Sequence, residues 1–167
     1  MSARRQRQMC IRDSYYIEGI IMISTEEENR AVQCLHDFIY YFNKKDKSKI
    51  LNCLHYPHMA QSDNNDPTIY KNEEEMWGYI GFLLKKLEKE ENWDKSTLDK
   101  VEVINKSDNA VQCLVEFNRR LENNESYATA TGIWVATKKN GHWGLQIRAM
   151  IPTAGKISIL AGAKLKD

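Results

Sequence analysis

Two side chains in this sequence have the type and setting expected of a functional site, Arg119 and His58. Arg119 follows an apolar segment, and a guanidinium at the edge of an apolar hollow would bind a small anionic or carbonyl group. His58 follows Pro57, and an imidazole near its usual pKa can exchange protons at neutral pH. Both have plainer interpretations, because Arg119 could extend past a packed helix to water and His58 could be a hydrogen-bonded structural residue.

No other group of residues has the spacing that a metal, phosphate or covalent mechanism requires. His36 and His142 have no further ligand at metal-binding spacing, so we predict no metal site. The chain has no glycine-rich phosphate loop and no Gly-x-Ser-x-Gly turn, and we predict no cofactor. The side chain of Trp77 is predicted to form part of the pocket wall or of the core.

The composition indicates one globular domain. A chain of 167 residues with 42% hydrophobic content can bury one core. No apolar run is long enough to span a bilayer. The formal charge of +1 and the lack of a basic, aromatic stripe argue against a nucleic-acid protein. We therefore expect neither a nucleic-acid nor a membrane partner.

The segment from Arg4 to Ser14 resembles a translated sequencing adapter. Neither an apolar segment nor a small-residue cleavage site follows its arginines, which argues against a targeting peptide. We expect residues 1–23 to be non-native or disordered, with Met22 as a candidate native start. Leaving out the segment's four arginines and one aspartate changes the formal charge from +1 to −2, so the basic tail does not indicate nucleic-acid binding.

Three cysteines remain when Cys10 in this segment is set aside: Cys34, Cys53 and Cys113. They have no Cys-x-x-Cys spacing, and Cys34 and Cys113 lie in apolar patterns. We therefore predict buried free thiols rather than disulfides or zinc ligands, and a reducing cytoplasm as the compartment.

The first half of the chain is predicted to be mostly helical. Thr25 and Glu28 form a capping box, and apolar residues then recur at helical spacing as far as Phe42. This pattern predicts a helix that ends near residues 43–46. A second, short helix is predicted over residues 48–54.

An extended segment and a loop lead to the next helix. Residues 55–60 are predicted to be extended and residues 62–67 to form a loop. Asn72 is followed by a glutamate three residues later, which predicts a capped helix through about Glu90. The charged residues 85–91 are predicted to lie at a solvated helix end.

Four β-strands are predicted for the rest of the domain. Asn-Gly at residues 140–141 is a strong hairpin signal, and Asn-Asn at residues 123–124 can adopt the same turn. The predicted strands cover residues 98–105, 110–121, 126–138 and 142–151. The tail 152–167 is weakly patterned, and Ile157, Ile159 and Leu160 in it could form a short strand.

Two-residue turns at these positions would fix the pairing of the strands. The predicted pairs are Arg119–Ala128, Phe117–Ala130, Val115–Gly132, Cys113–Trp134, Trp134–Ile147, Gly132–Ala149 and Ala136–Leu145. A one-residue bulge would reverse the face of every later residue.

One face of this sheet is predicted to carry the core and a hollow. Its core residues are Val111, Cys113, Val115, Phe117, Trp134, Trp143, Leu145 and Ile147. The small side chains of Ala128, Ala130, Gly132 and Ala149 leave a hollow beside Arg119 unless helix residues fill it. The predicted ligand-binding residues are Arg119, Trp77, Phe117, Trp134, Ala128, Ala130 and Tyr56.

The opposite face is mixed in polarity, as in the contact between the sheets of a homodimer. Glu116 and Arg148 are predicted to pair on it across the third of these strands. The predicted dimer residues are Glu116, Asn118, Thr131, Gln146 and Arg148.

Four segments, residues 42–46, 54–58, 117–119 and 140–148, resemble recurring patterns of the nuclear transport factor 2-like superfamily. The similarity covers about Ser24 to Ile151 and is greatest to its bacterial SnoaL-like and steroid delta-isomerase-like branches. It implies an α+β, cystatin-like cone, in which N-terminal helices pack on a curved antiparallel sheet. It also implies a pocket at the open end of the cone and dimers formed through the outer face.

The resemblance leaves the reaction open. Enzymes of this kind use an aspartate on a pocket-facing strand as general base. The inward strand positions here hold no aspartate, and Glu116 is predicted to face outward. Our first hypothesis is a non-catalytic or weakly catalytic domain that binds a small organic ligand with Arg119 as the anchor. The alternatives are a SnoaL-like cyclase, isomerase or hydratase that uses His58 as acid–base, and a non-catalytic dimerisation module.

Overall fold

The computed structural model describes residues 25–63 and 66–155. Its two long helices begin at the predicted capping residues. Helix α1 (Thr25–Lys44) has three glutamates in its first turn, where the positive end of the helix dipole favours them. Helix α3 (Glu73–Glu90) is capped by Asn72, whose side chain accepts a hydrogen bond from the backbone N–H of Glu75 at 3.0 Å.

The short helix α2 (Lys47–Asn52) lies slightly earlier than predicted. Its N-cap is Asp46, whose side chain accepts from the backbone N–H of Lys49 at 3.2 Å. A helix this short needs tertiary packing for stability, which Ile50 and Leu51 provide because both are buried.

Two strands follow. Strand β1 (Leu54–Ser62) confirms the predicted extended segment and includes Pro57. Strand β2 (Thr68–Tyr70) was not predicted, because three residues are too few to show an alternating pattern. It pairs antiparallel with β1 and places Ile69 opposite Met59.

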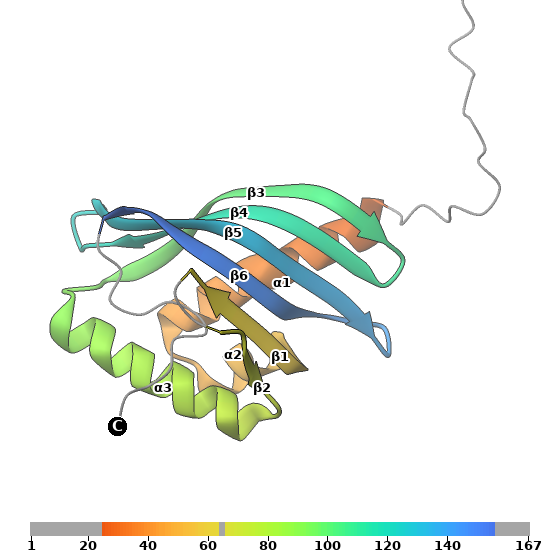
Figure 1. Ribbon diagram of the computed structural model, residues 1–167, viewed down its shortest axis with the longest axis horizontal. Coiled ribbons are helices and arrows are strands. Elements are labelled where there is room, and N and C mark those ends of the chain that lie inside the picture. Colours follow the sequence, from red (N-terminus) through yellow and green to blue (C-terminus); the bar gives the residue numbers. More distant parts are fainter. Residues whose placement is uncertain (1–24, 64–65, 156–167) are drawn as a thin grey trace, which may run out of the picture.

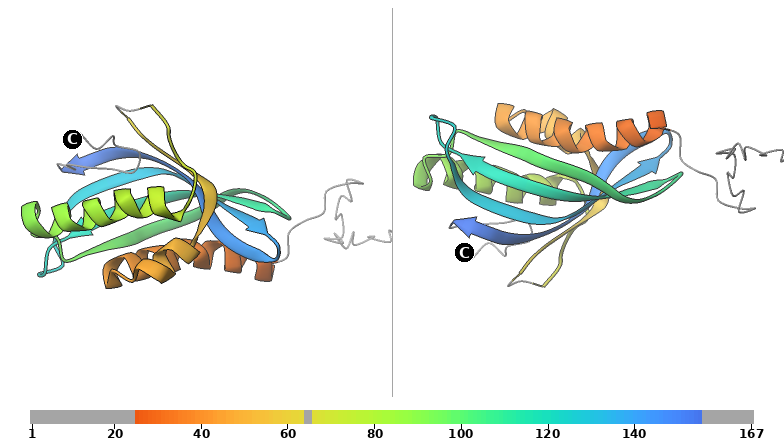
Figure 2. Two further views of the ribbon diagram at one scale, coloured as in Figure 1. Left: turned by 90° about the horizontal axis from the view of Figure 1, so that it is seen from below. Right: turned by 90° about the horizontal axis from the view of Figure 1, so that it is seen from above.

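The four predicted strands are confirmed; three of them extend beyond the predicted bounds, and β4 ends one residue earlier. They are β3 (Lys95–Ser107), β4 (Ala110–Arg120), β5 (Ser126–Lys139) and β6 (His142–Gly155). The strands in the described residues form one sheet in the order β2-β1-β6-β5-β4-β3, and among them only β1 and β6 run parallel. The sheet curves over the helices, which lie on its inner side (Figures 1 and 2). This is the predicted α+β cone.

The pairing of β4 with β5 agrees with the prediction. Arg119 lies opposite Ala128 and Phe117 opposite Ala130, so both Arg119 and Phe117 face the helices. The next hairpin agrees only as far as the pair Ala136–Leu145.

A bulge at Gln146 of β6, opposite Val135 and Ala136 of β5, then shifts the register by one residue. Trp134 pairs with Arg148 instead of Ile147, and Gly132 pairs with Met150 instead of Ala149. The predicted positions of these β6 residues are therefore wrong. Arg148 and Met150 are buried on the inner face, and the predicted Glu116–Arg148 pair on the outer face does not form.

The end of the domain also differs from the prediction. Strand β6 continues past Ile151 to Gly155, where Gly155 pairs with Ala128. The extension 1–23 and the tail from residue 156, including the proposed strand at Ile157–Leu160, lie outside the described residues. Among the described helices, none combines the length and apolarity needed to cross a membrane.

Candidate functional site

A cavity of about 40 Å³ lies between the inner face of the sheet and helices α1 and α3. Space of this size holds a few water molecules or a fragment of comparable size. Its walls are apolar and aromatic except for two arginines. The lining residues are Phe38, Ile39, Phe42, Tyr79, Leu83, Leu87, Phe117, Arg119, Trp134, Arg148 and Met150.

Arg119 lies in the cavity wall with its charge balanced. Its side chain is 2% exposed, so the alternative in which it reaches water is wrong. Its Nη1 atom donates to the two carboxylate oxygens of Glu91 at 2.9 and 3.3 Å. Glu91 is the C-cap residue of α3 and also accepts from the Tyr127 hydroxyl at 2.7 Å. Burial and this carboxylate raise the pKa of Tyr127, so it stays a donor.

Arg148 lies in the same wall without a carboxylate partner. It is 7% exposed and forms no ion pair with any residue in the described ranges 25–63 and 66–155. Its Nε atom donates to Nε2 of His58 at 3.1 Å, and its guanidinium carbon lies 4.9 Å from the centroid of the Phe38 ring. Its Nη2 atom is enclosed without a hydrogen-bond partner. Burial lowers the pKa of Arg148, although a guanidinium keeps its proton in proteins.

His58 holds Arg148 in place. The histidine is fully buried, and its Nδ1 atom lies 3.0 Å from the carbonyl oxygen of Leu145. Nδ1 therefore carries the proton and donates to Leu145, which leaves Nε2 to accept from Arg148. Burial, followed by the charge of Arg148, holds the pKa of His58 well below 6.5. Both nitrogens are occupied and His58 does not line the cavity, so this geometry argues against proton transfer by His58.

A second buried histidine, His55, is also neutral. The Thr137 hydroxyl donates its proton to Oε1 of Gln146 at 2.8 Å. Because that proton is used, the hydroxyl oxygen accepts a hydrogen bond from Nδ1 of His55, which lies 2.8 Å away. Nε2 of His55 then accepts from Nδ1 of His142 at 3.3 Å. Burial, followed by Lys139 and His142, lowers the pKa of His55 to about 4.

These two histidines predict a loss of stability in acid. Both have a folded-state pKa below the unfolded value near 6.5, so the unfolded chain binds more protons as the pH falls. The free energy of unfolding therefore has its full value above about pH 6.5, as far as these histidines are concerned. Below that pH it falls by up to about 1.4 kcal/mol per pH unit for each histidine. Urea unfolding between about pH 7 and 5 measures this slope. His58→Gln should reduce the slope, whereas the exposed His36→Gln should not; equal slopes in both variants would contradict the assignment.

The other predicted ligand residues are not all brought together. Phe117 and Trp134 line the cavity with Arg119. Ala128 and Ala130 are buried on the inner face, but they do not line the cavity. Trp77 lies away from it, with the Lys47 ammonium 5.3 Å from its ring centroid. Tyr56 does not line the cavity either, although its hydroxyl is enclosed without a partner among the described residues.

Sequence reasoning missed two residues of the site, Arg148 and Glu91. The prediction that Arg148 faces outward is wrong because no local pattern indicates the bulge at Gln146 in β6. Glu91 belongs to a charged segment that is typical of a solvated helix end. Its side chain is 9% exposed because Arg119 and Tyr127 reach it from the strands.

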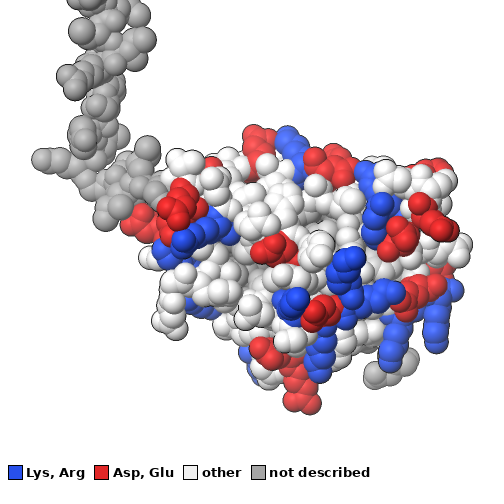
Figure 3. Space-filling model, turned by 180° about the vertical axis from the view of Figure 1, so that it is seen from behind, with Lys and Arg blue, Asp and Glu red and all other residues white. Residues whose placement is uncertain are grey.

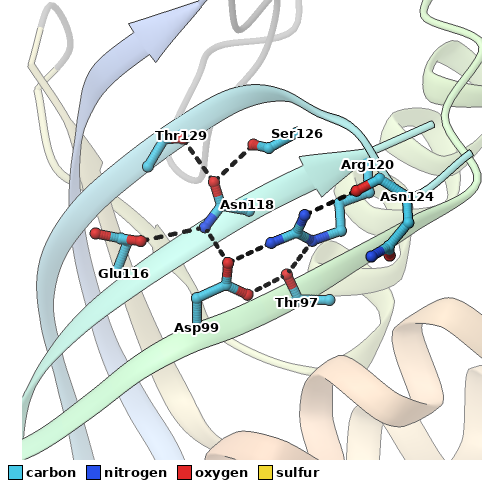
Figure 4. Close-up of polar contacts among 8 residues, drawn as sticks. All are labelled: Thr97, Asp99, Glu116, Asn118, Arg120, Asn124, Ser126 and Thr129. Carbon is cyan, nitrogen blue, oxygen red and sulfur yellow. Dashed lines mark hydrogen bonds and ion pairs between the residues drawn. The ribbon is translucent and has the colours of Figure 1, made fainter.

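The outer face carries a polar network over β3, β4 and β5 (Figure 4). Asn118 donates to Asp99 at 2.9 Å and to Glu116 at 3.4 Å. Its side-chain oxygen accepts from Ser126 and Thr129 at 2.7 and 2.6 Å. Glu116 and Asn118 thus lie on the predicted face, where Ile133 and Ile151 are 43% and 57% exposed. On the side of the molecule shown in Figure 3, acidic and basic side chains are interspersed.

The cysteines agree with the prediction. Cys34, Cys53 and Cys113 are buried and unbridged. Burial raises the pKa of Cys113 to about 11 and that of Cys53 to about 12, so these thiols stay protonated. In the described part of the chain, no three metal-ligating side chains converge on a point that would hold an ion.

Comparison with known proteins supports the fold. No protein-family model and no curated protein matches the chain. A Nostoc punctiforme protein of unknown function with a cystatin-like fold is 12% identical, with a TM-score of 0.64 over 80% of this chain and 96% of its own. A ketosteroid isomerase-like protein from Erwinia carotovora is 10% identical, with a TM-score of 0.57 over 78% and 99%.

A third similar structure is LinA, which is 14% identical with a TM-score of 0.59 over 83% of this chain and 95% of its own. Another similar structure, from Novosphingobium aromaticivorans, is described as nuclear transport factor 2-like with a cystatin-like fold. The chain has this cystatin-like fold of the nuclear transport factor 2-like proteins, as the sequence resemblance predicted. Identities this low show the fold alone.

Proposed function

We propose that the inner cavity binds a small organic molecule. The observation that supports this most strongly is the presence of two buried guanidinium groups, Arg119 and Arg148, in an otherwise apolar wall. Burying a charge is costly unless it is paired or serves a ligand. Mostly apolar walls with a few placed polar groups are also typical of ligand sites.

The size of the cavity limits the ligand. At about 40 Å³ it accepts only a few heavy atoms unless its walls move. Helix α3, which contributes Leu83 and Leu87 to the cavity wall, is not part of the sheet. Moving α3 outward would therefore widen the cavity without breaking the pairing of the sheet.

A thermal-shift screen against a metabolite library tests this proposal, because a ligand that binds only the native state raises the melting temperature. We expect one chemical class to raise it in the wild type. Leu83→Phe, which fills the cavity, should abolish the shift, whereas Ile133→Phe on the outer face should keep it. No hit, or hits that survive Leu83→Phe unchanged, would contradict binding in the cavity.

Catalysis is the less favoured alternative. Solved structures with this fold include one described as ketosteroid isomerase-like and one as a putative scytalone dehydratase. The described residues that line the cavity here include no carboxylate and no histidine. Both ring nitrogens of His58, the predicted acid–base residue, are hydrogen-bonded, one to Leu145 and the other to Arg148. These observations favour binding over acid–base chemistry.

We also propose that the outer face forms a homodimer in a cytoplasmic protein. The exposed Ile133 and Ile151 lie beside the polar residues Glu116 and Asn118, a mixture that suits a subunit contact. The three unbridged thiols support a reducing compartment. Native mass spectrometry distinguishes a dimer from a monomer.

A further inference from the structure

We propose that the ligand is a short monocarboxylate whose carboxylate group binds Arg148. This inference rests on the proposed function, because it assigns a chemical class to the ligand of the same cavity. It follows from the charge of the wall, from the geometry of Arg148 and from the size of the space.

The charges of the wall add up to a single unbalanced positive charge. The positive charge of Arg119 is balanced by Glu91, whose carboxylate lies 2.9 Å away. Arg148 has no carboxylate partner among residues 25–63 and 66–155. A monoanion neutralises the wall, whereas a dianion would bring in an unpaired negative charge and a cation would be repelled.

One donor atom of Arg148 has no acceptor among the described residues. Nε is fixed by His58 at 3.1 Å, and the ring of Phe38 lies 4.9 Å from the guanidinium carbon. Nη2 is enclosed and has no acceptor. A planar carboxylate matches the planar donors of a guanidinium better than a spherical halide does.

A second enclosed donor lies outside the lining of the cavity. The Tyr56 hydroxyl is buried without a partner among the described residues. Burial and then the charge of Glu73 raise the pKa of Tyr56, and the charge of Arg148 opposes them. Two enclosed donors that lack acceptors are unusual in a native fold and call for an explanation.

The cavity size and lining define the rest of the ligand. A space of about 40 Å³ accepts a chain of only a few carbons. Phe117, Trp134 and Leu83 offer that chain an apolar surface. Binding of formate, acetate, propionate and butyrate therefore shows the longest chain that the cavity accepts.

The experiment compares sodium propionate with its neutral isostere propionamide, at ionic strength matched with sodium chloride. We expect propionate to raise the melting temperature of the wild type by roughly 8 °C at a concentration of one hundred times its dissociation constant. Propionamide should cause no comparable shift. Disodium succinate should bind more weakly than propionate.

Variants of Arg148 locate the site. Arg148→Gln should weaken propionate binding at least tenfold, and Arg148→Lys should weaken it less, because lysine keeps the charge but loses the planar donors. The control is Arg30→Gln on the exposed face of α1, which should bind propionate like the wild type. If Arg148→Gln does not fold, the comparison of propionate with propionamide in the wild type still decides the question.

The outcomes separate this inference from the proposed function. Equal shifts with propionate and propionamide, or unchanged binding by Arg148→Gln, would overturn the monocarboxylate. A second outcome is that neutral library compounds raise the melting temperature only while the cavity is open, and that no carboxylate raises it. This outcome would overturn the assignment of a monocarboxylate but would leave the cavity as a binding site. The absence of any hit among both sets would overturn the proposed function itself.

Discussion

Replacing Gly132 with alanine is expected to destabilise the fold by more than about 3 kcal/mol, a size of effect that marks severe steric conflict. A Cβ atom at this position would lie 1.8 Å from the carbonyl oxygen of Ala149 and 2.9 Å from the Cα atom of Met150. Both contacts are to backbone of the neighbouring strand, so no side-chain rotation relieves them. Strands β5 and β6 would have to separate next to Arg148.

A glycine elsewhere in the chain provides the matched control. Gly78 lies on the exposed side of helix α3, and a Cβ there would meet nothing within 4 Å. Gly78→Ala should therefore stabilise the protein by about 0.5–1 kcal/mol, since alanine favours the helix. Urea unfolding of both variants measures the two effects. Equal stability of Gly132→Ala and the wild type would mean that β6 does not have the register that turns Arg148 inward.

Glu91→Gln is expected to cost about 3–5 kcal/mol, because it removes the carboxylate that balances a buried arginine. Arg119 is 2% exposed and Glu91 is 9% exposed, so water compensates little for the lost charge. Glutamine keeps the size of the side chain and an acceptor for Tyr127, so the change isolates the charge. Urea unfolding again gives the free energy.

Two controls show whether charge causes the effect. The double variant Glu91→Leu, Arg119→Met removes both charges and should recover much of the stability. Glu26→Gln removes a carboxylate from the Glu26–Arg30 pair, whose side chains are 76% and 58% exposed, and should change stability by less than about 1 kcal/mol. If Glu91→Gln costs no more than Glu26→Gln, the balance of charge in the cavity wall is not as we describe it.

The elements of the fold could be predicted because their signals are local. Asn72 caps α3 through its own neighbour Glu75, and Asn140-Gly141 forms the turn between β5 and β6. The bulge in β6 could not be predicted in this way. Regular alternation after Leu145 would place the apolar Ile147, Ala149 and Ile151 inward and Arg148 outward, so the sequence pattern favours the register without the bulge.

The candidate site could be predicted only in part. Arg119, Phe117 and Trp134 were predicted from the pairing of β4 with β5, which has no irregularity before Arg119. Glu91 and Arg148 depend on contacts between distant segments, which spacing along the chain does not show. The predicted hollow at Ala128 and Ala130 is a similar case, because small side chains leave space only where no neighbour fills it.

The most direct test of the carboxylate site is the measurement of intermolecular nuclear Overhauser effects between propionate and the protein. If the ligand binds in the cavity, its methyl protons should show effects to the ring protons of Phe38, Phe117 and Trp134, which line that space. These effects should disappear in Arg148→Gln. Nuclear Overhauser effects to exposed side chains such as Ile133 would contradict binding of the carboxylate by Arg148. Effects to the cavity residues that persist in Arg148→Gln would contradict it as well.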